Sequence, residues 1–190
     1  MSIMVYIDPI GIRFPNREVD PKAASDIIEK SRHLSTFLLM LSLLVFNNVR
    51  HSILVLKAKS DRQQLKGIGH MLPIGLMLLI GITVGISALS SANILFLIFA
   101  GVSILSASSL FYYIFKSELK KNEWLLEHLG NIIGSGIGAY TAFFAFGGRR
   151  FLAEVFTGQM QIIPWVLPTL IGIIATYHLT KKYRQKYRVA

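Results

Sequence analysis

The chain has 190 residues, of which 53% are hydrophobic and only 16% are charged, and it contains no cysteine. This composition is too apolar for an ordinary soluble domain and is typical of a protein whose helices cross a membrane several times. The lack of cysteine excludes disulfide bonds, thiolate metal sites and cysteine nucleophiles. A net charge of +10 could indicate a nucleic-acid partner, but its placement between apolar runs favours a role in membrane insertion.

The N-terminal segment, residues 1–33, is expected to lie outside the cytoplasm and to end in a polar helix. Residues 1–20 contain short apolar clusters broken by prolines and a glycine, which predicts extended or irregular structure. Asp20 followed by Pro21 is typical of a helix start, because aspartate caps free N–H groups and proline fits the first helical position. The polar helix is therefore predicted to begin at Pro21.

Several apolar runs are long enough to cross a bilayer, which takes about 20 helical residues. The predicted spans cover residues 34–57, 70–89, 93–115, 127–150 and 162–180. A short amphipathic helix over residues 151–161 is predicted to lie in the membrane interface. The predicted fold class is therefore all-α, a polytopic transmembrane helical bundle of five spans over residues 34–180, followed by a basic cytoplasmic tail at residues 181–190.

The run over residues 127–150 is crowded with small residues and is predicted to form the packed centre of the bundle. Gly130, Gly134 and Gly138 recur at every fourth position and Ala142 continues the row, so these residues form a flat strip on one helix face. In lipid, such a strip allows neighbouring helices to approach closely. Gly81 and Gly85 in the second span, and several serines in the third, predict further close helix contacts.

The lysines and arginines determine the predicted topology. With five spans, thirteen of the twenty basic residues lie on the side that also holds the C-terminus. These are Arg50, Lys57, Lys59, Arg62, Lys66, Lys116, Lys120, Lys121, Lys181, Lys182, Arg184, Lys186 and Arg188. By the positive-inside rule the C-terminus is cytoplasmic and the N-terminus is outside, in what we expect to be a bacterial cytoplasmic membrane. We expect the basic side to contact anionic lipids, and no nucleic-acid partner is needed to explain the charge.

The histidines are candidate ligands of a cofactor. Under this topology His51, His70, His128 and His178 belong to four different spans, and all lie toward the cytoplasmic ends. They could converge on a metal ion, or two of them could ligate a haem iron, because neutral imidazole suits both. The alternative is that histidine, being amphipathic, collects at membrane interfaces. No two of these histidines have the close spacing of a metal-binding motif.

Arg50 is the deepest charge in the predicted spans. An ionisable residue at such a depth usually marks a functional site. The alternatives are that its long side chain reaches back to the interface, or that the first span is shifted toward residue 31 so that Arg50 lies at its boundary. Asn131 and Ser135 share a helix face with His128 and could line a hydrated path or supply hydrogen bonds between helices. No aspartate or glutamate lies in the middle of a predicted span, which disfavours a buried carboxylate relay.

Two stretches of the chain resemble a bacterial family of predicted polytopic membrane proteins of unknown function. The matching residues are Trp124, His128, Gly138–Phe143 and Trp165–Thr169, and Val49–His51 is also similar. The resemblance implies an all-helical bundle and offers no activity.

Three functions are compatible with these features. The first is a non-enzymatic membrane interaction protein or complex subunit, with the glycine face of residues 127–150 packing within the bundle, against a second copy or against a partner. The second is a haem- or metal-binding redox protein that uses the histidines, assisted by Arg50. The third is a small-solute channel or carrier with a path past Asn131 and Ser135. No catalytic residue is predicted.

Overall fold

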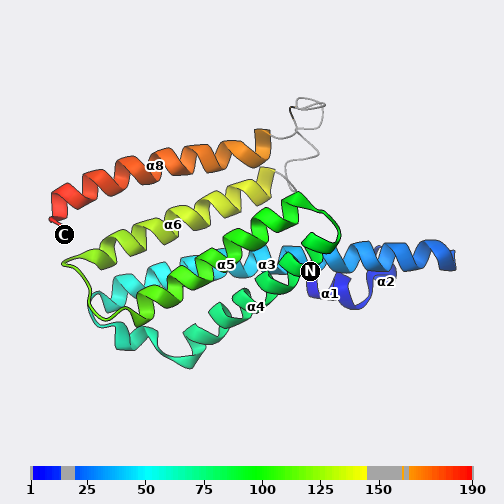
Figure 1. Cartoon of the computed structure of the whole chain (residues 1–190), viewed down its shortest axis with the longest axis horizontal. Coiled ribbons are helices and arrows are strands. Elements are labelled where there is room, and N and C mark those ends of the chain that lie inside the picture. The colour runs from blue at the N-terminus through cyan, green and yellow to red at the C-terminus, as the bar shows by residue number, and fades with distance from the viewer. Residues whose placement is uncertain (1, 14–19, 145–159, 161–162, 190) are drawn as a thin grey trace. The chain divides into compact units, whose positions relative to one another are not determined.

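The computed structural model describes residues 2–13, 20–144, 160 and 163–189, and these residues contain helices and no β-strand (Figure 1). The long helices are α3 (Pro21–Ala58), α4 (Ile68–Ser90), α5 (Ile94–Phe115), α6 (Glu123–Ala142) and α8 (Ile163–Tyr187). Two short helices, α1 (Ser2–Ile7) and α2 (Pro9–Arg13), precede them, and a 3₁₀ helix, η1 (Arg62–Leu65), lies between α3 and α4. The all-α prediction is confirmed for this part of the chain.

Three of these helices are long and apolar enough to cross a membrane, fewer than the five predicted. They are α3 from Ala23 to Ala58, α4 and α5. The fourth predicted span is described only as far as residue 144, and the interfacial helix predicted for residues 151–161 lies outside the described residues except for Met160.

Helix α3 starts at Pro21, as the sequence predicts. Residues 2–13 differ from the prediction, because they contain the helices α1 and α2. Asp20 precedes Pro21, and the carbonyl of Asp20 accepts a hydrogen bond from the Ala24 N–H at 2.8 Å. The same aspartate–proline pattern at Asp8 and Pro9 starts α2, where the Asp8 carboxylate accepts from the Gly11 N–H at 2.8 Å. The prediction of extended or irregular structure was wrong for residues 2–7 and 9–13, and at position 9 the proline was interpreted as a breaker rather than as the first residue of a helix.

The basic segment predicted as a tail is also largely helical. Helix α8 continues through the basic residues after residue 180 and ends at Tyr187. No proline or glycine interrupts residues 181–187, and lysine, arginine and glutamine are good helix formers, so the helix extends past the apolar run.

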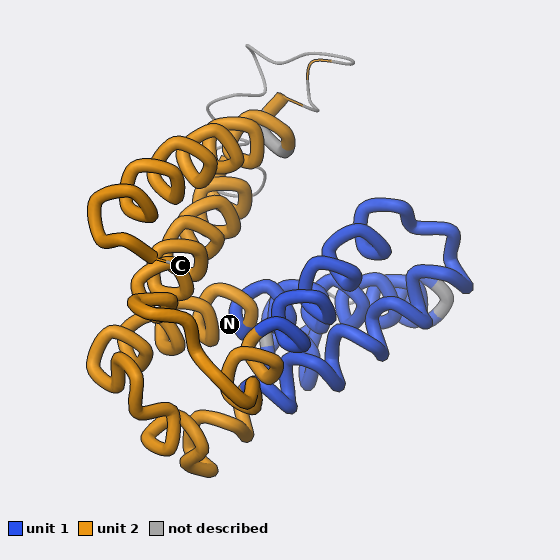
Figure 2. The backbone as a smooth tube through the Cα atoms, turned by 60° about the vertical axis from the view of Figure 1, so that its left-hand side comes forward, with its two compact units in different colours: residues 1–43, 74–109 blue, residues 44–73, 110–190 orange. Residues whose placement is uncertain are grey.

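The described chain forms two compact units, which Figure 2 shows in different colours. Unit 1 comprises Met1–Leu43 and Ile74–Ser109, and unit 2 comprises Leu44–Pro73 and Leu110–Ala190, so α3, α4 and α5 contribute to both. The core of unit 1 contains buried Phe37 and Met40. The ring of Phe37 stacks on that of Phe96, with 4.1 Å between the ring centroids.

Small residues bring α4 and α5 together in unit 1. A Cβ atom added to Gly81 would lie 3.2 Å from Ile104 Cγ1 and 3.3 Å from Ser103 Oγ, and one added to Gly85 would lie 3.5 Å from Ala100 Cβ. The close contact predicted from the small residues of these two helices is therefore confirmed at this position.

In unit 2, α6 and α8 pack against each other, and the close approach is made by a glycine of α8. A Cβ atom added to Gly172 would lie 2.2 Å from the side chain of Ile137 on α6. Of the glycine strip predicted on α6, Gly138 has a close neighbour, Val45 Cγ2 at 3.2 Å from an added Cβ. Gly130 and Gly134 have no described atom within 4 Å of an added Cβ. Of the three glycines of the predicted strip, only Gly138 is thus in close contact, and the side chain that packs over Gly172 is Ile137, beside the strip.

We expect Gly81→Leu to lower the free energy of unfolding by about 1–3 kcal/mol, the usual cost of overpacking a close contact. Gly75→Leu is the matched control in the same helix, because no atom lies within 4 Å of a Cβ added there. The two variants can be compared by denaturant unfolding in the same detergent. Equal stabilities would contradict the close contact between α4 and α5.

Candidate functional site

Polar side chains from three helices of unit 2 meet in one buried place. The sequence supplies them as two adjacent pairs, His51 and Ser52 on α3 and Glu127 and His128 on α6, together with His70 from the first turn of α4. We call these five residues the histidine cluster. His51 and Ser52 are fully buried and His70 is 3% exposed. Such burial is costly unless the polar atoms are paired, so their contacts define the site.

The two imidazoles of His51 and His70 are hydrogen-bonded to each other. His51 Nδ1 lies 3.0 Å from His70 Nε2, and the two rings are nearly parallel. His51 Nε2 lies 3.3 Å from Glu127 Oε1, an ion-pair distance without hydrogen-bond alignment. A proton on His51 Nε2 is favoured by this carboxylate, so His51 Nδ1 accepts and His70 Nε2–H donates. His70 Nδ1 is then a buried lone pair, with no hydrogen-bond partner among the described residues.

Ser52 and His128 form a reciprocal contact between α3 and α6. His128 Nδ1 lies 3.0 Å from the Ser52 carbonyl oxygen, so it carries a proton and donates. The Ser52 hydroxyl lies 2.7 Å from the same nitrogen and donates to the His128 carbonyl oxygen at 3.1 Å. A base that activates a serine must instead offer a lone pair to the hydroxyl. The pair therefore joins two helices and is not arranged as a nucleophile and its base.

Glu127 links the cluster to its surroundings. Its carboxylate accepts a hydrogen bond from Asn131 Nδ2 at 2.8 Å, and its side chain is 20% exposed. The Tyr113 ring of α5 meets His51 edge-on, with 5.6 Å between ring centroids. No carboxylate lies in the middle of a predicted span, but Glu127 lies at the start of one and still reaches His51. Helix α6 begins at Glu123, before the predicted span, and brings Glu127 to this position. In the sequence, the adjacent polar pairs at 51–52 and 127–128 were the signal from which the contact with Glu127 could have been predicted.

Arg50 satisfies a backbone carbonyl that a proline has released. Pro73 lies inside α4 and has no N–H, so the Gly69 carbonyl four residues earlier lacks its intrahelical donor. Arg50 Nη1 donates a hydrogen bond to that carbonyl. Asn47, one turn earlier on α3, donates to the Pro73 carbonyl at 3.0 Å. Arg50 is thus bound to α4 through its guanidinium, which accounts for its depth without a catalytic role.

Two predicted site residues lie apart from the cluster. His178 is exposed on α8, where its ring meets that of Tyr177. Ser135 is buried but donates to the carbonyl of Ile132 on its own helix at 2.8 Å. Among the described residues, no three histidine, cysteine, aspartate or glutamate side chains are grouped so that they could hold a metal ion. The predicted set of four histidines is therefore reduced to three, two of which use ring nitrogens to bind each other.

A salt bridge sets the start of α6, one turn before Glu127. Lys116 Nζ lies 2.6 Å from Glu123 Oε1, and the Lys120 N–H donates to Glu123 Oε2 at 2.8 Å. Burial of the Glu123 carboxyl favours a higher pKa, but the hydrogen bonds from Lys116 and Lys120 outweigh it and hold this pKa below its usual range. The hydrogen bond to Glu123 raises the pKa of Lys116.

The described residues thus define an all-helical protein with three helices long and apolar enough to cross a membrane, and with a buried cluster of histidines. No family model, curated protein or solved structure matches the chain. The resemblance to a bacterial family of polytopic membrane proteins therefore stays a prediction.

We expect Arg50→Gln to lower the free energy of unfolding by about 0.5–1.5 kcal/mol, because it removes the hydrogen bond to the Gly69 carbonyl. Pro73→Ala restores an N–H to position 73, so Arg50→Gln should cost much less in a Pro73→Ala background. Denaturant unfolding of the four proteins of this double-mutant cycle measures the coupling. Additive effects would show that Arg50 does not compensate for Pro73.

We expect Glu123→Gln to destabilise the protein at about pH 7 and to have a progressively smaller effect as the pH falls below the ordinary carboxyl pKa of 4.5. The Glu123 pKa is lower in the folded state, so the contribution of the carboxylate is present above its ordinary pKa of 4.5 and is lost as the pH falls through the folded value. Unfolding curves of the wild type and the variant at several pH values measure this difference. Glu118→Gln is the control, because Glu118 is exposed in the same loop.

Proposed function

We propose that the protein is an integral protein of a bacterial cytoplasmic membrane, with five spans, its N-terminus outside and its C-terminus in the cytoplasm. Support comes from the three helices that are long and apolar enough to cross a membrane. The helical and largely apolar residues of α6 and α8 would form the fourth and fifth spans. The excess of lysine and arginine on the side of the C-terminus supports the orientation.

Within that membrane, we propose a non-enzymatic role as an interaction protein or complex subunit whose helix packing responds to protonation. The observation that carries this proposal is the distance of 3.0 Å between His51 Nδ1 and His70 Nε2. Such a bond needs a lone pair on one of the two nitrogens, and histidine is the side chain that ordinarily gains its proton between about pH 8 and pH 5. When both rings are protonated, the bond is lost and two positive charges repel each other.

The groups that face His51 make the response specific. His70 approaches it from α4, Glu127 from α6 and Tyr113 from α5. The Glu127 carboxylate lies beside His51, 3.3 Å from its Nε2. A proton on His70 has no carboxylate beside it among the described contacts, and the positive charge of Arg50 opposes it. Protonation is therefore expected to separate the first turn of α4 from α3.

The other predicted functions receive less support from the geometry. Ser52 and His128 are hydrogen-bonded through backbone carbonyls, which argues against hydrolysis by this pair. Asn131 and Ser135 direct hydrogen bonds to their own helix rather than along a path between helices. His51 Nδ1 and His70 Nε2 bind each other, which leaves His70 Nδ1 as a lone pair, and the described residues place no group of three metal ligands around it.

The proposal is tested by measuring a distance between helices as the pH falls. Because the chain has no cysteine, spin labels can be attached specifically to cysteines introduced at the exposed positions Ile53 on α3 and Leu72 on α4. In nanodiscs, we expect the distribution of distances between the labels to shift as the pH falls from about 8 to about 4.

The histidine variants distinguish this response from a general effect of acid. His70→Asn should remove the shift, because position 70 can no longer be protonated. His178→Gln, which changes an exposed histidine on α8, should leave the shift intact. A shift of the same size in His70→Asn, or no shift in the wild type, would refute the proposed response.

A further inference from the structure

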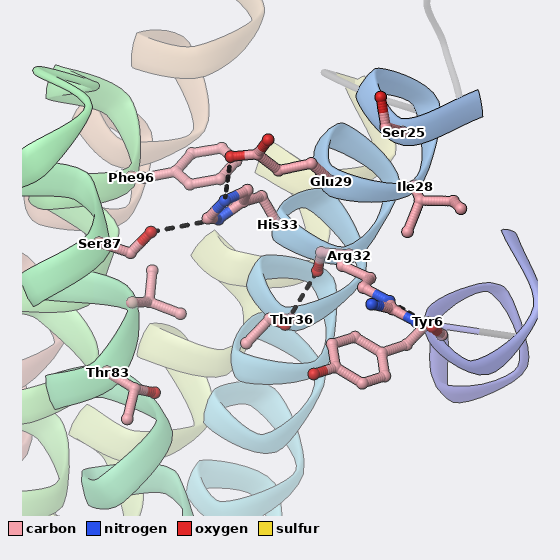
Figure 3. A pocket seen from close by; sticks show the side chains of 11 residues that line it. Tyr6, Ser25, Ile28, Glu29, Arg32, His33, Thr36, Thr83, Ser87 and Phe96 are labelled. Carbon is pink, nitrogen blue, oxygen red and sulfur yellow. Dashed lines mark hydrogen bonds and ion pairs between the residues drawn. The ribbon is translucent and has the colours of Figure 1, made fainter. Parts of the chain in front are cut away.

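Unit 1 contains an open pocket of about 500 Å³ that is remote in sequence from the histidine cluster (Figure 3). Its walls come from α1, α3, α4 and the start of α5. Polar side chains dominate one side, with Glu29, Arg32 and His33 from three successive positions of one face of α3. Phe96 of α5 supplies an apolar wall. The pocket therefore offers charge of both signs beside an apolar surface.

The pocket lies where the membrane-crossing helices of this unit begin and end. Arg32 and His33 immediately precede the apolar run of α3 that starts at residue 34. Ser87 lies in the last turn of α4, and Phe96 lies in the first turn of α5. Three chain segments thus place the pocket at the same depth, at one end of the candidate spans. That depth is the level of lipid headgroups.

The charged side chains of the pocket are accessible and only partly engaged. The Glu29 side chain is 75% exposed and lies 3.7 Å from His33 Nε2, while His33 Nδ1 lies 3.1 Å from the Ser87 hydroxyl. Arg32 uses its Nε–H for the Tyr6 carbonyl at 3.3 Å, which is one of the five N–H donors of a guanidinium. A carboxylate and a guanidinium three residues apart on a helix suit a ligand that carries one positive and one negative group.

We propose that this pocket binds the phosphoethanolamine headgroup of a membrane lipid, with the ammonium group at Glu29 and the phosphate at Arg32. Arginine is well suited to phosphate, because its N–H donors match the phosphate oxygens. A primary ammonium donates hydrogen bonds to a carboxylate, and the acyl chains would continue along the apolar helix surfaces below.

The aromatic side chains of the pocket favour a primary ammonium over the quaternary ammonium of choline. Recognition of choline relies on aromatic faces around the cation. Here the face of Tyr6 is already covered by the Arg32 guanidinium, 5.5 Å from the ring centroid. The ring of Phe96 is stacked on that of Phe37. A glycerol headgroup, in turn, would leave Glu29 without a cation.

The proposal is tested by lipid retention. The full-length protein, delipidated in detergent, is titrated with dioleoyl phosphatidylethanolamine, phosphatidylcholine and phosphatidylglycerol, and bound lipid is counted by native mass spectrometry. We expect one phosphatidylethanolamine to bind at least about fivefold more tightly than the other two lipids, as expected for one added charge-assisted hydrogen bond. Soluble phosphoethanolamine should compete only at much higher concentration than the lipid.

Substitutions test whether the preference for phosphatidylethanolamine comes from this pocket. Glu29→Gln should abolish the preference over phosphatidylcholine while leaving the contact between Arg32 and Tyr6 intact. Arg32→Gln should weaken retention of both phosphatidylethanolamine and phosphatidylcholine. Glu118→Gln and Arg184→Gln change exposed charges of unit 2 and should leave retention unchanged. Equal retention of the three lipids, or an undiminished preference in Glu29→Gln, would overturn the proposal. Soluble phosphoethanolamine binding as tightly as the lipid would overturn the lipid as its source.

Discussion

Residues 47–52 of α3 place a run of polar side chains inside unit 2, where Asn47, His51 and Ser52 are fully buried. Each buried polar group that lacks a hydrogen bond would cost about 1–3 kcal/mol. Because these polar side chains need hydrogen-bond partners, only certain parts of the neighbouring helices can pack against them. Helix α4 must present its first turn, with His70 and the carbonyls around Pro73, and α6 must present Glu127 and His128. The packing of unit 2 follows from this requirement.

At Pro73 the group that needs a partner is a backbone carbonyl of α4, and the donor comes from α3. A proline inside a helix creates an unpaired carbonyl, which is tolerated in a membrane protein when a neighbouring helix supplies a donor. Arg50 supplies it, and Asn47 binds the carbonyl of the proline itself. Two residues that each look unfavourable in isolation, a charge and a helix breaker, therefore stabilise each other. The histidine pair lies beside this contact, so the proposed response to protonation would act on a junction that is also held by polar contacts.

Unit 1 is stabilised in a different way. Its helices meet through an apolar core at Phe37 and Met40, and through glycines that allow α4 and α5 to approach closely. Two of its charged residues, Glu29 and Arg32, line the pocket, where the Glu29 side chain is exposed. The buried histidine cluster of unit 2 agrees with the proposed proton-responsive junction, and the open pocket of unit 1 agrees with the proposed headgroup site.

The sequence by itself determined the helical class, three long apolar helices, the start of α3 at Pro21 and the close contact of α4 with α5. These features follow from local signals: apolar run length, the cap formed by aspartate and proline, and the spacing of small residues. Only the tertiary structure decided which histidines meet, that Glu127 joins them, and that Gly172 rather than Gly130 or Gly134 provides the close approach to a neighbouring helix. These depend on the rotation of each helix about its axis and on its longitudinal shift, which are set by the partners it packs against and leave no trace in the spacing of residues along one helix.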